Sequence, residues 1–359
     1  MMDSLYIIGN IAAKDILDAI KNRVVVYQII AMSVLLVAIK GLGLIIQPPA
    51  TQVMVFDPAG STLSAMLAES TEFSVHQVAS LEELQTSISN MGFGLGAEMG
   101  LEIAPGFDLQ FEDSEQVEIK GYVSWANRGK AEALQAEIGA ALTELVGKPV
   151  TVEIEGNIIT PPAKIGLLVG IITIFAVTII LNNGIILVPA LMIEEKQNHT
   201  LDALLVSPAS INQVVAGKAI AGAFYVLVTV LIVYLVYWSG VYNWGVTALF
   251  LLGAVLFAVS VGLLFGVLFD RQQEMTGWLS FCLVFIIGTI FIELINLDLP
   301  VWIEQLLPWI PPVALARIFW ASFSSQPDIS QILLAFGSVL IFSCILFGIV
   351  AWRIKQADR

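Results

Sequence analysis

Long apolar runs separated by short polar segments dominate this chain. A helix needs about 20 residues to cross the hydrocarbon core of a bilayer. Six runs reach that length: Val24 to Ile46, Ile165 to Ile193, Val214 to Trp238, Trp244 to Phe269, Met275 to Asn296 and Ile332 to Trp352. The first run is longer than the apolar core of a signal peptide, so we expect six transmembrane helices, with the first retained as an anchor.

Basic residues predict the orientation of these helices, because lysine and arginine in short loops stay on the cytoplasmic side. Nine basic residues lie at one set of helix ends: Lys14, Lys21, Arg23, Lys196, Lys218, Arg271, Arg353, Lys355 and Arg359. The opposite short loops, 239–243 and 297–330, carry only Arg317. This pattern predicts cytoplasmic N- and C-termini and an external segment between the first two helices.

Residues 1–23 have the periodicity of an amphipathic helix in the cytoplasmic interface. Its expected apolar face consists of Leu5, Ile8, Ala12, Ile16 and Ala19. Its expected polar face consists of Asn10, Lys14, Asp18 and Lys21, with Ile7 and Ile11 intruding. The first transmembrane helix, 24–46, follows directly.

The external segment, 47–162, alternates strand-like and helix-like patterns, which predicts an α/β domain. The expected strands are Gln52 to Asp57, Phe73 to Val78, Val117 to Val123 and Val150 to Ile154. The expected helices begin at Ser61, run from Leu81 to Ser89 with Ser80 and Glu83 as a cap, and run from Arg128 to Val146. About 115 residues are enough for a separate core.

The remainder, 163–359, holds the other five transmembrane helices and an apolar stretch, 297–330, that is too short for two crossings. Proline interrupts this stretch at Pro300, Pro308, Pro311 and Pro312. We therefore expect a re-entrant or interfacial pair of short helices on the outer side. Gly262 and Gly266 in the fourth run have the spacing of closely packed membrane helices.

Composition and charge exclude several classes of function. Apolar residues make up 57% of the chain and charged residues 13%, and the net charge of −14 argues against a nucleic-acid partner. The external segment alone has 17 acidic and four basic residues, a local charge of −13. Two cysteines and two histidines offer no multi-ligand metal site. We expect no catalytic residue, metal ion or cofactor in this chain.

The motifs of ATP binding are also missing from the sequence. Gly217-Lys218 has neither the first glycine nor the hydroxyl residue of a phosphate-binding P-loop. A loose glycine motif at 92–97 lies in the external segment, and we interpret it as a turn.

The loop after the second transmembrane run carries a compact pattern of polar residues and leucines. Thr200 can cap a short helix that Ser207-Pro208 ends, and a second helix starts near Ser210. Leu201, Leu204 and Leu205 share one face of the short helix. The pattern fits an interfacial turn or a helix presented to a cytoplasmic partner.

This loop resembles that of ABC-2 type transporter permeases, which reads E-(E/R)-(K/R)-x-x-x-T-L-(D/E)-x-L-L-x-(S/T)-P, with G-K some ten residues later. The matching residues are Glu194, Glu195, Lys196, Thr200, Leu201, Asp202, Leu204, Leu205, Ser207, Pro208, Gly217 and Lys218. The resemblance implies that 194–210 is the coupling helix that sits in a groove of a separate ATPase subunit. ATP and Mg would bind to that subunit.

The resemblance extends over essentially the whole chain. The external segment is similar to the insert of the larger ABC-2 permeases, such as sodium-extrusion and drug or lipid exporter permeases, at Val53 to Asp57 and Ile103 to Phe107. It implies a second permease, identical or different, a location in the cell membrane, and a role for the N-terminal helix in seating the ATPase. It also implies an outer gate that includes Pro308, Pro311, Pro312 and Arg317.

Three polar residues at membrane depth are candidates for the transport pathway, since such groups are costly there. Asn182 and Asn183 lie near the middle of the second helix, where helix packing is the alternative explanation. Glu293 lies near the outer end of the fifth helix, where it either reaches water or is a candidate to bind an ion.

These patterns predict an α-helical polytopic membrane protein of six transmembrane helices with an extracytoplasmic α/β domain between helices 1 and 2. The resemblance implies that the chain is the permease subunit of an ABC transporter, an exporter that a separate ATP-binding subunit drives through the cytoplasmic coupling helix and that works by alternating access. The alternative is a receptor-like membrane sensor with a ligand-binding outer domain, although six helices exceed what a sensor needs.

Overall fold

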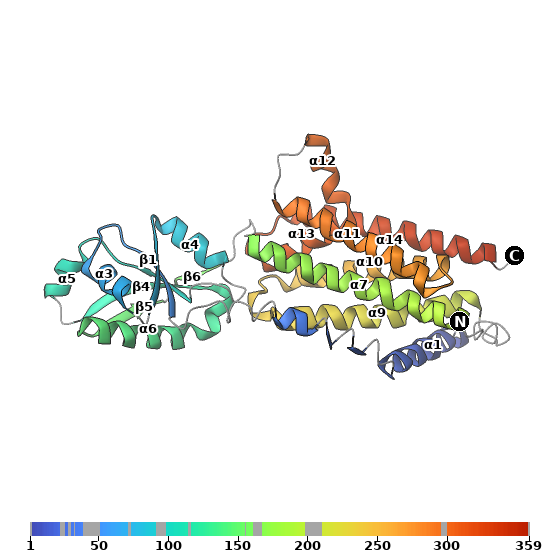
Figure 1. The fold of residues 1–359 in the computed structure, drawn as a ribbon, viewed down its shortest axis with the longest axis horizontal. Coiled ribbons are helices and arrows are strands. Elements are labelled where there is room, and N and C mark those ends of the chain that lie inside the picture. The colour runs from blue at the N-terminus through green and yellow to red at the C-terminus, as the bar shows by residue number, and fades with distance from the viewer. Residues whose placement is uncertain are drawn as a thin grey trace.

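The computed structural model describes residues 2–21, 26–27, 30–31, 33–38, 51–70, 73–90, 98–113, 116–154, 156–160, 167–197, 210–295 and 300–357. Figure 1 shows two parts along one long axis, an α/β domain and a helical bundle. We call the end of the bundle beside the α/β domain the domain-side end. The opposite end, where helix α1 (Met2–Lys21) packs, is the α1-side end.

Five helices of the bundle are long and apolar enough to cross a membrane. They are α7 (Leu167–Gln197), α9 (Ile211–Val236), α10 (Trp244–Leu268), α11 (Gln272–Ile295) and α14 (Ile329–Ala357). They confirm the second to sixth expected transmembrane helices. Most of the expected first helix, 24–46, lies outside the described residues, of which 26–27, 30–31 and 33–38 are helical.

Small residues let α10 pack closely against α7 near the α1-side end. A Cβ atom on Gly262 would lie 2.5 Å from the carbonyl oxygen of Gly184, and one on Gly266 would lie 2.5 Å from the sulfur of Met192. A larger side chain at Gly262 would force the helices apart because it meets backbone, whereas one at Gly266 would displace the Met192 side chain. The close packing predicted from the spacing of Gly262 and Gly266 is thus confirmed.

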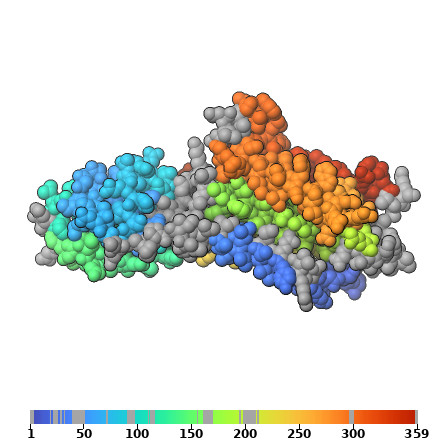
Figure 2. Space-filling view, viewed as in Figure 1, coloured from blue at the N-terminus to red at the C-terminus, as the bar shows by residue number. Residues whose placement is uncertain are grey.

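The expected pair of short helices is present between α11 and α14. Helix α12 (Val301–Leu306) and the 3-10 turn η3 (Leu307–Trp309) precede α13 (Pro311–Phe323), with a bend of 77° between the two arms. Pro311 and Pro312 occupy the first turn of α13, where their missing N–H groups cost no hydrogen bond. Helix α13 is mostly buried in the bundle, and Trp302 of α12 is exposed. Figure 2 shows α12 projecting from the bundle.

The α/β domain contains a mixed six-stranded sheet. Its strands are β1 (Thr51–Phe56), β2 (Phe73–Val78), β3 (Met99–Glu102), β4 (Val117–Ser124), β5 (Val150–Glu153) and β6 (Ile158–Ile159). The order is β2-β1-β3-β4-β5, and β6 pairs with β4. Strand β1 is parallel to β2 and β3, whereas β4 is antiparallel to β3. The four expected strands are present, and β3 and β6 are additional.

Helices cover both faces of this sheet. On one face, α3 (Thr62–Glu69), α5 (Phe107–Asp113) and α6 (Ala131–Val146) pack on the strands through residues such as Leu67, Phe107 and Ile138. On the other face, α4 (Leu81–Asn90) packs through Leu84 and Ile88. The predicted cap of α4 is present, since the Ser80 hydroxyl accepts a hydrogen bond from the Glu83 N–H at 3.1 Å. Residues 91–97, which include the glycine motif, lie outside the described residues.

Two short 3-10 segments join the α/β domain to the bundle, η1 (Trp125–Lys130) and η2 (Trp238–Gly240). Nη1 of Arg128 donates hydrogen bonds to the carbonyl oxygens of Trp125 and Ser239, each at 2.7 Å, and its guanidinium lies 4.0 Å from the centre of the Trp125 ring. Nε1 of Trp125 donates to the carbonyl oxygen of Val241 at 3.3 Å. We call Trp125, Arg128, Ser239 and Val241 the domain anchor.

The loop that receives the domain anchor is itself tied to the buried helix α13. The backbone N–H groups of Tyr242 and Asn243 donate to the carbonyl oxygen of Ser322, at 3.0 and 2.9 Å. The Asn243 side chain donates to the carbonyl oxygen of Ser324 at 2.6 Å. The α/β domain is therefore connected through loop 238–243 to the C-terminal end of α13.

Candidate functional site

Much of the predicted coupling loop lies outside the described residues. This applies to Thr200, Leu201, Asp202, Leu204, Leu205, Ser207 and Pro208. Glu194 and Glu195 belong to the last turns of α7. Helix α7 ends at Gln197 and α9 begins at Ile211, so both ends of the loop lie at the α1-side end of the bundle.

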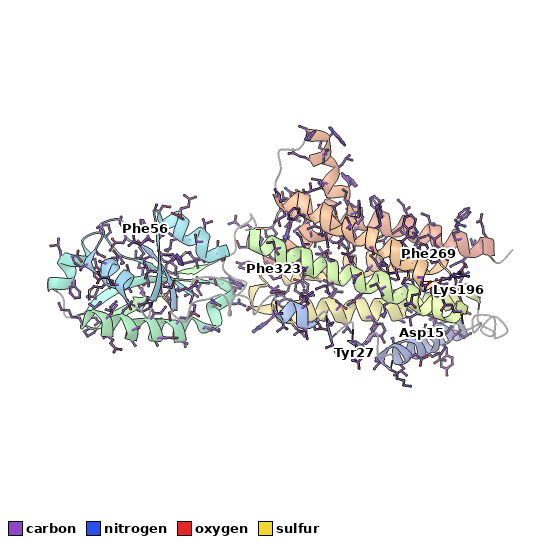
Figure 3. All side chains as sticks on the ribbon, viewed as in Figure 1. Asp15, Tyr27, Phe56, Lys196, Phe269 and Phe323 are labelled. Carbon is purple, nitrogen blue, oxygen red and sulfur yellow. The ribbon has the colours of Figure 1, made fainter. Side chains whose placement is uncertain are left out.

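Lys196 fixes the end of α7 to the junction between α10 and α11. Its Nζ forms an ion pair with Asp270 at 2.8 Å and also donates to the carbonyl oxygens of Phe269 and Val267, at 3.2 and 3.4 Å. These carbonyl groups belong to the C-terminal end of α10, where no further helical N–H can satisfy them. Figure 3 shows Lys196 and Phe269 near each other at the α1-side end.

Helix α9, which follows the loop, begins with a capping box at Ser210. The Ser210 side chain accepts from the N–H at the third helical position, and the Gln213 side chain accepts from the Ser210 N–H at 2.8 Å. The Gln213 amide also donates to the Ser4 hydroxyl of α1 at 2.8 Å. The helix start predicted near Ser210 is confirmed, and it is tied to the N-terminal helix.

Lys218 lies in the protein interior rather than on the loop surface. Its side chain is 1% exposed and its Nζ lies 3.3 Å from Oδ2 of Asp15, whose side chain is 5% exposed. The same Nζ donates to the carbonyl oxygen of Leu191 at 3.2 Å. Lys218 therefore joins α9 to α1 and α7, and any part it has in coupling acts through these helices.

Helix α1 packs closely on α9 around this ion pair. A Cβ atom on Gly217 would lie 2.6 Å from Cγ2 of Ile11, and the Tyr225 hydroxyl donates to the carbonyl oxygen of Ile16. The faces of α1 expected from the sequence need a correction, because Ile11 packs inward and Leu5 is 63% exposed. Asp15 lies on the packed face, three and four residues after Ala12 and Ile11, a burial that the apolar pattern of the sequence does not indicate.

Of the two candidate asparagines in α7, Asn183 is hydrogen-bonded to the neighbouring helix α9. Nδ2 of Asn183 donates to the Thr229 hydroxyl of α9 at 2.8 Å, and that hydroxyl donates to the carbonyl oxygen of Tyr225. Asn183 is buried and Asn182 is half-buried. The contact of Asn183 fits the helix-packing explanation, because hydrogen-bonded polar groups link membrane helices.

Glu293 and Arg317, which the sequence assigned to different roles, form one ion pair at the domain-side end. Nε and Nη2 of Arg317 lie 2.8 and 2.6 Å from Oε1 of Glu293. The pair joins α11 to α13, the helix that starts at Pro311 and Pro312. Pro308 lies in the turn between α12 and α13, and its carbonyl oxygen accepts from the Ser338 hydroxyl of α14 at 3.4 Å.

These features occupy two ends of one bundle. At the α1-side end, Lys196, Ser210 and Lys218 join the end of α7 and the start of α9 to neighbouring helices. At the domain-side end, the Glu293–Arg317 pair and the domain anchor hold α13. Helices α7, α9, α10 and α11 run between the two ends, so a displacement at one end can reach the other through continuous helices.

The comparison with protein families agrees with this arrangement. A family described as ABC-2 family transporter protein matches residues 23–352, which include the α/β domain, four of the five long apolar helices and most of the fifth, α14. No curated protein matches the chain significantly. The match covers most of the chain, which therefore belongs to the ABC-2 family of transporter proteins and is a multi-pass membrane component of such a transporter.

Proposed function

We propose that this chain is the permease subunit of an ABC exporter, which a separate ATP-binding subunit drives through the loop 194–210. The observation that carries the proposal is the geometry around that loop. Lys196 joins its start to α10 and α11, and Lys218 and Gln213 join its end to α1 and α7. A push on the loop would thus move several helices together.

The proposed topology places the α1-side end in the cytoplasm of the cell membrane and the α/β domain outside. The distribution of basic residues supports it, because Lys196, Lys218, Arg271 and Lys355 lie at the α1-side ends of α7, α9, α11 and α14. The ATPase would then bind beside the loop and α1, with ATP and Mg in that subunit. A second permease, identical or different, would complete the transporter.

In this proposal the chain works by alternating access. Closure of the ATPase subunits on ATP displaces 194–210 together with α7 and α9. The helices transmit the displacement to α13, where Pro308, Pro311, Pro312 and Arg317 form the outer gate. Asn182, Asn183 and Glu293 are the candidate pathway residues. The ion pair to Arg317 favours a gating role for Glu293 over the binding of a free cation.

Co-purification with the ATPase subunit tests the proposal. The substitution Leu204→Asp places a charge on the expected contact face, and we expect it to abolish recovery of the ATPase with the tagged permease. The matched control is Val206→Asp, which adds the same charge about half a turn away, on the opposite face of the expected helix. Normal assembly and transport by Leu204→Asp would contradict the assignment of the coupling loop.

A further inference from the structure

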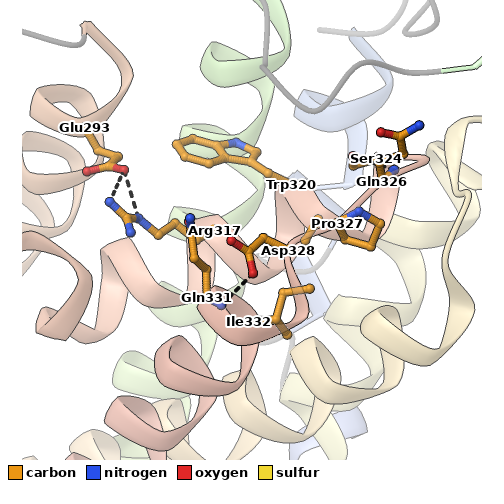
Figure 4. Close-up of a pocket in the computed structure, with 10 residues that line it drawn as sticks. Glu293, Arg317, Trp320, Ser324, Gln326, Pro327, Asp328, Gln331 and Ile332 are labelled. Carbon is orange, nitrogen blue, oxygen red and sulfur yellow. Dashed lines mark hydrogen bonds and ion pairs between the residues drawn. The ribbon is translucent and has the colours of Figure 1, made fainter.

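A cavity of about 300 Å³ at the domain-side end is lined by charged groups that already bind other groups of the chain. Figure 4 shows Arg317 turned toward Glu293, and the Asp328 carboxylate accepts hydrogen bonds from Ser330 and Gln331. These charges are satisfied within the chain, so the cavity gives no indication of a ligand. The α/β domain differs, because one edge of its sheet has backbone groups without partners among the described residues.

Strand β2 (Phe73–Val78) forms one edge of the described sheet, next to β1. Successive residues of a strand direct their backbone N–H and C=O groups to opposite sides of it. The Phe56 carbonyl of β1 accepts from the N–H of Ile103, so Phe56 faces β3 and its neighbour Val55 faces β2. Val55 lies opposite Gln77 in a parallel register, and it therefore bonds to the residues on either side of Gln77.

The backbone groups of Phe73, Val75 and Gln77 consequently face away from β1. None of these groups is hydrogen-bonded to another described residue. Gln77 is exposed and Val75 is half-buried, so this edge is open to solvent. The outer side of β2 therefore offers alternating donors and acceptors with which an extended chain can pair.

The opposite edge of the sheet, strand β5 (Val150–Glu153), is protected. Pro149 precedes it, the Val150 N–H donates to the Thr143 hydroxyl of α6 at 3.0 Å, and Val152 is 1% exposed. Natural sheets use proline, charge, bulges or covering elements in this way, because an open edge pairs with other chains. Strand β2 has six residues, no proline, no charged side chain and an unbroken register with β1. Such an edge is expected to be covered in the working protein.

The sequence of β2 is complementary to a second copy of itself. An antiparallel pair centred on Val75 places the two copies of Val75 opposite each other, Phe73 opposite Gln77, and Ser74 opposite His76. No charges oppose one another, and the Ser74 hydroxyl can bond to the imidazole across the pair. The segment 47–162 has 17 acidic and four basic residues, so two copies can approach favourably only through an uncharged stretch such as β2.

We propose that two copies of this chain pair antiparallel through β2, which joins their α/β domains into one continuous sheet. The backbone groups of Phe73, Val75 and Gln77 in one copy bond to those of Gln77, Val75 and Phe73 in the other. This inference rests on the proposed function and deepens it, because it identifies the second permease as an identical chain.

Cysteine cross-linking of the full-length chain in membranes tests this proposal, with Cys282 and Cys344 replaced by serine. The Cα atoms of the two copies of Val75 would lie about 5.5 Å apart, within the range of a disulfide bond. We expect Val75→Cys to give a covalent dimer on mild oxidation. Gln77→Cys is the matched control. Although Gln77 is more exposed, its two copies would lie about 14 Å apart, too far for a disulfide bond.

A proline variant tests whether the backbone makes the contact. Gln77→Pro, added to Val75→Cys, removes an N–H that faces away from β1, so it breaks no hydrogen bond within its own sheet. Across the two copies it removes two hydrogen bonds, and we expect the yield of dimer to fall about tenfold. Gln77→Thr keeps the N–H and should leave the yield unchanged.

Two results would overturn the proposal and leave the coupling-loop assignment untouched: no dimer from Val75→Cys, or equal yields from Val75→Cys and Gln77→Cys. A cross-linked product with a different protein in place of the dimer would assign the edge to that protein and overturn the pairing of two copies. Full yield in the presence of Gln77→Pro would show that the contact does not use the backbone of β2, and it would also overturn the proposal.

Discussion

Lys218 and Asp15 place opposite charges in the interior between α9 and α1, with side-chain exposures of 1% and 5%. Removing one member takes this opposite charge away from the buried one that remains, and breaking a buried ion pair in this way typically costs about 3–5 kcal/mol. We expect Lys218→Ala and Asp15→Ala each to lower the unfolding temperature of the purified chain markedly. The double variant Lys218→Met/Asp15→Leu should recover most of that loss, because it removes both charges and retains the volume. Asp270→Ala is the control, since Asp270 is 81% exposed and its pair with Lys196 should contribute less than about 1 kcal/mol. A double variant that is no more stable than the single ones would argue against an electrostatic role for the pair.

At the same scale, the sequence identified some of the site residues and not others. Lys196 and Lys218 were found through a motif, but the motif says nothing about their partners. Asp15 was missed because one carboxylate among the alternating residues of an amphipathic helix is usually solvated. Only the packing of α1 on α9 shows that it is buried. The ion pair between Glu293 and Arg317 could not be predicted from the sequence either, because 24 residues and a 77° bend separate the two.

Helices and strands were predictable wherever hydrophobic periodicity is strong and long. The five long helices of the bundle and strands β1, β2, β4 and β5 correspond to expected segments, because membrane helices need about 20 apolar residues and buried strands need branched ones. Strand β3 has four residues, one of them a glycine, and carries too short a signal. The faces of α1 were assigned imperfectly, because both its packed side and exposed positions such as Leu5 are apolar.

Helix α1 offers a test at this scale, because its approach to α9 depends on Gly217. A Cβ atom there would lie 2.6 Å from Cγ2 of Ile11 and 3.3 Å from the carbonyl oxygen of Ile8, so even alanine forces α1 away. We expect Gly217→Ala to make α1 more accessible, with faster cleavage by trypsin after Lys14 and Lys21. Gly277→Ala in α11 is the matched control, because a Cβ atom there meets nothing within 4 Å and alanine favours the helix. Equal cleavage rates in the two variants would mean that α1 does not depend on close contact at Gly217.

At the scale of the whole molecule, the domain anchor joins the α/β domain to the bundle. The sequence predicts the α/β domain and the helical bundle but not how they contact each other. Arg128 donates to Ser239 across 111 residues, and because the acceptor is a backbone carbonyl, any residue type at 239 could provide it. The anchor contacts loop 238–243, and that loop is hydrogen-bonded to the end of α13. The position of the α/β domain and that of α13 are thus connected through a short path of hydrogen bonds.

This connection gives a prediction for Arg128. Its hydrogen bond to Ser239 and its contact with the Trp125 ring should together contribute about 1.5–3 kcal/mol to the attachment. We expect Arg128→Gln to broaden the distances between spin labels on an exposed site of α6, introduced by Glu137→Cys, and on Cys344 of α14, with Cys282 replaced by serine. Lys130→Gln removes a neighbouring exposed charge of η1 and should leave the distances unchanged. Unchanged distances in Arg128→Gln would show that other contacts hold the domain. If the distances broaden, the same variant should also increase the mobility of a label at the C-terminal end of α13, because Ser322 and Ser324 bind the loop that the anchor fixes.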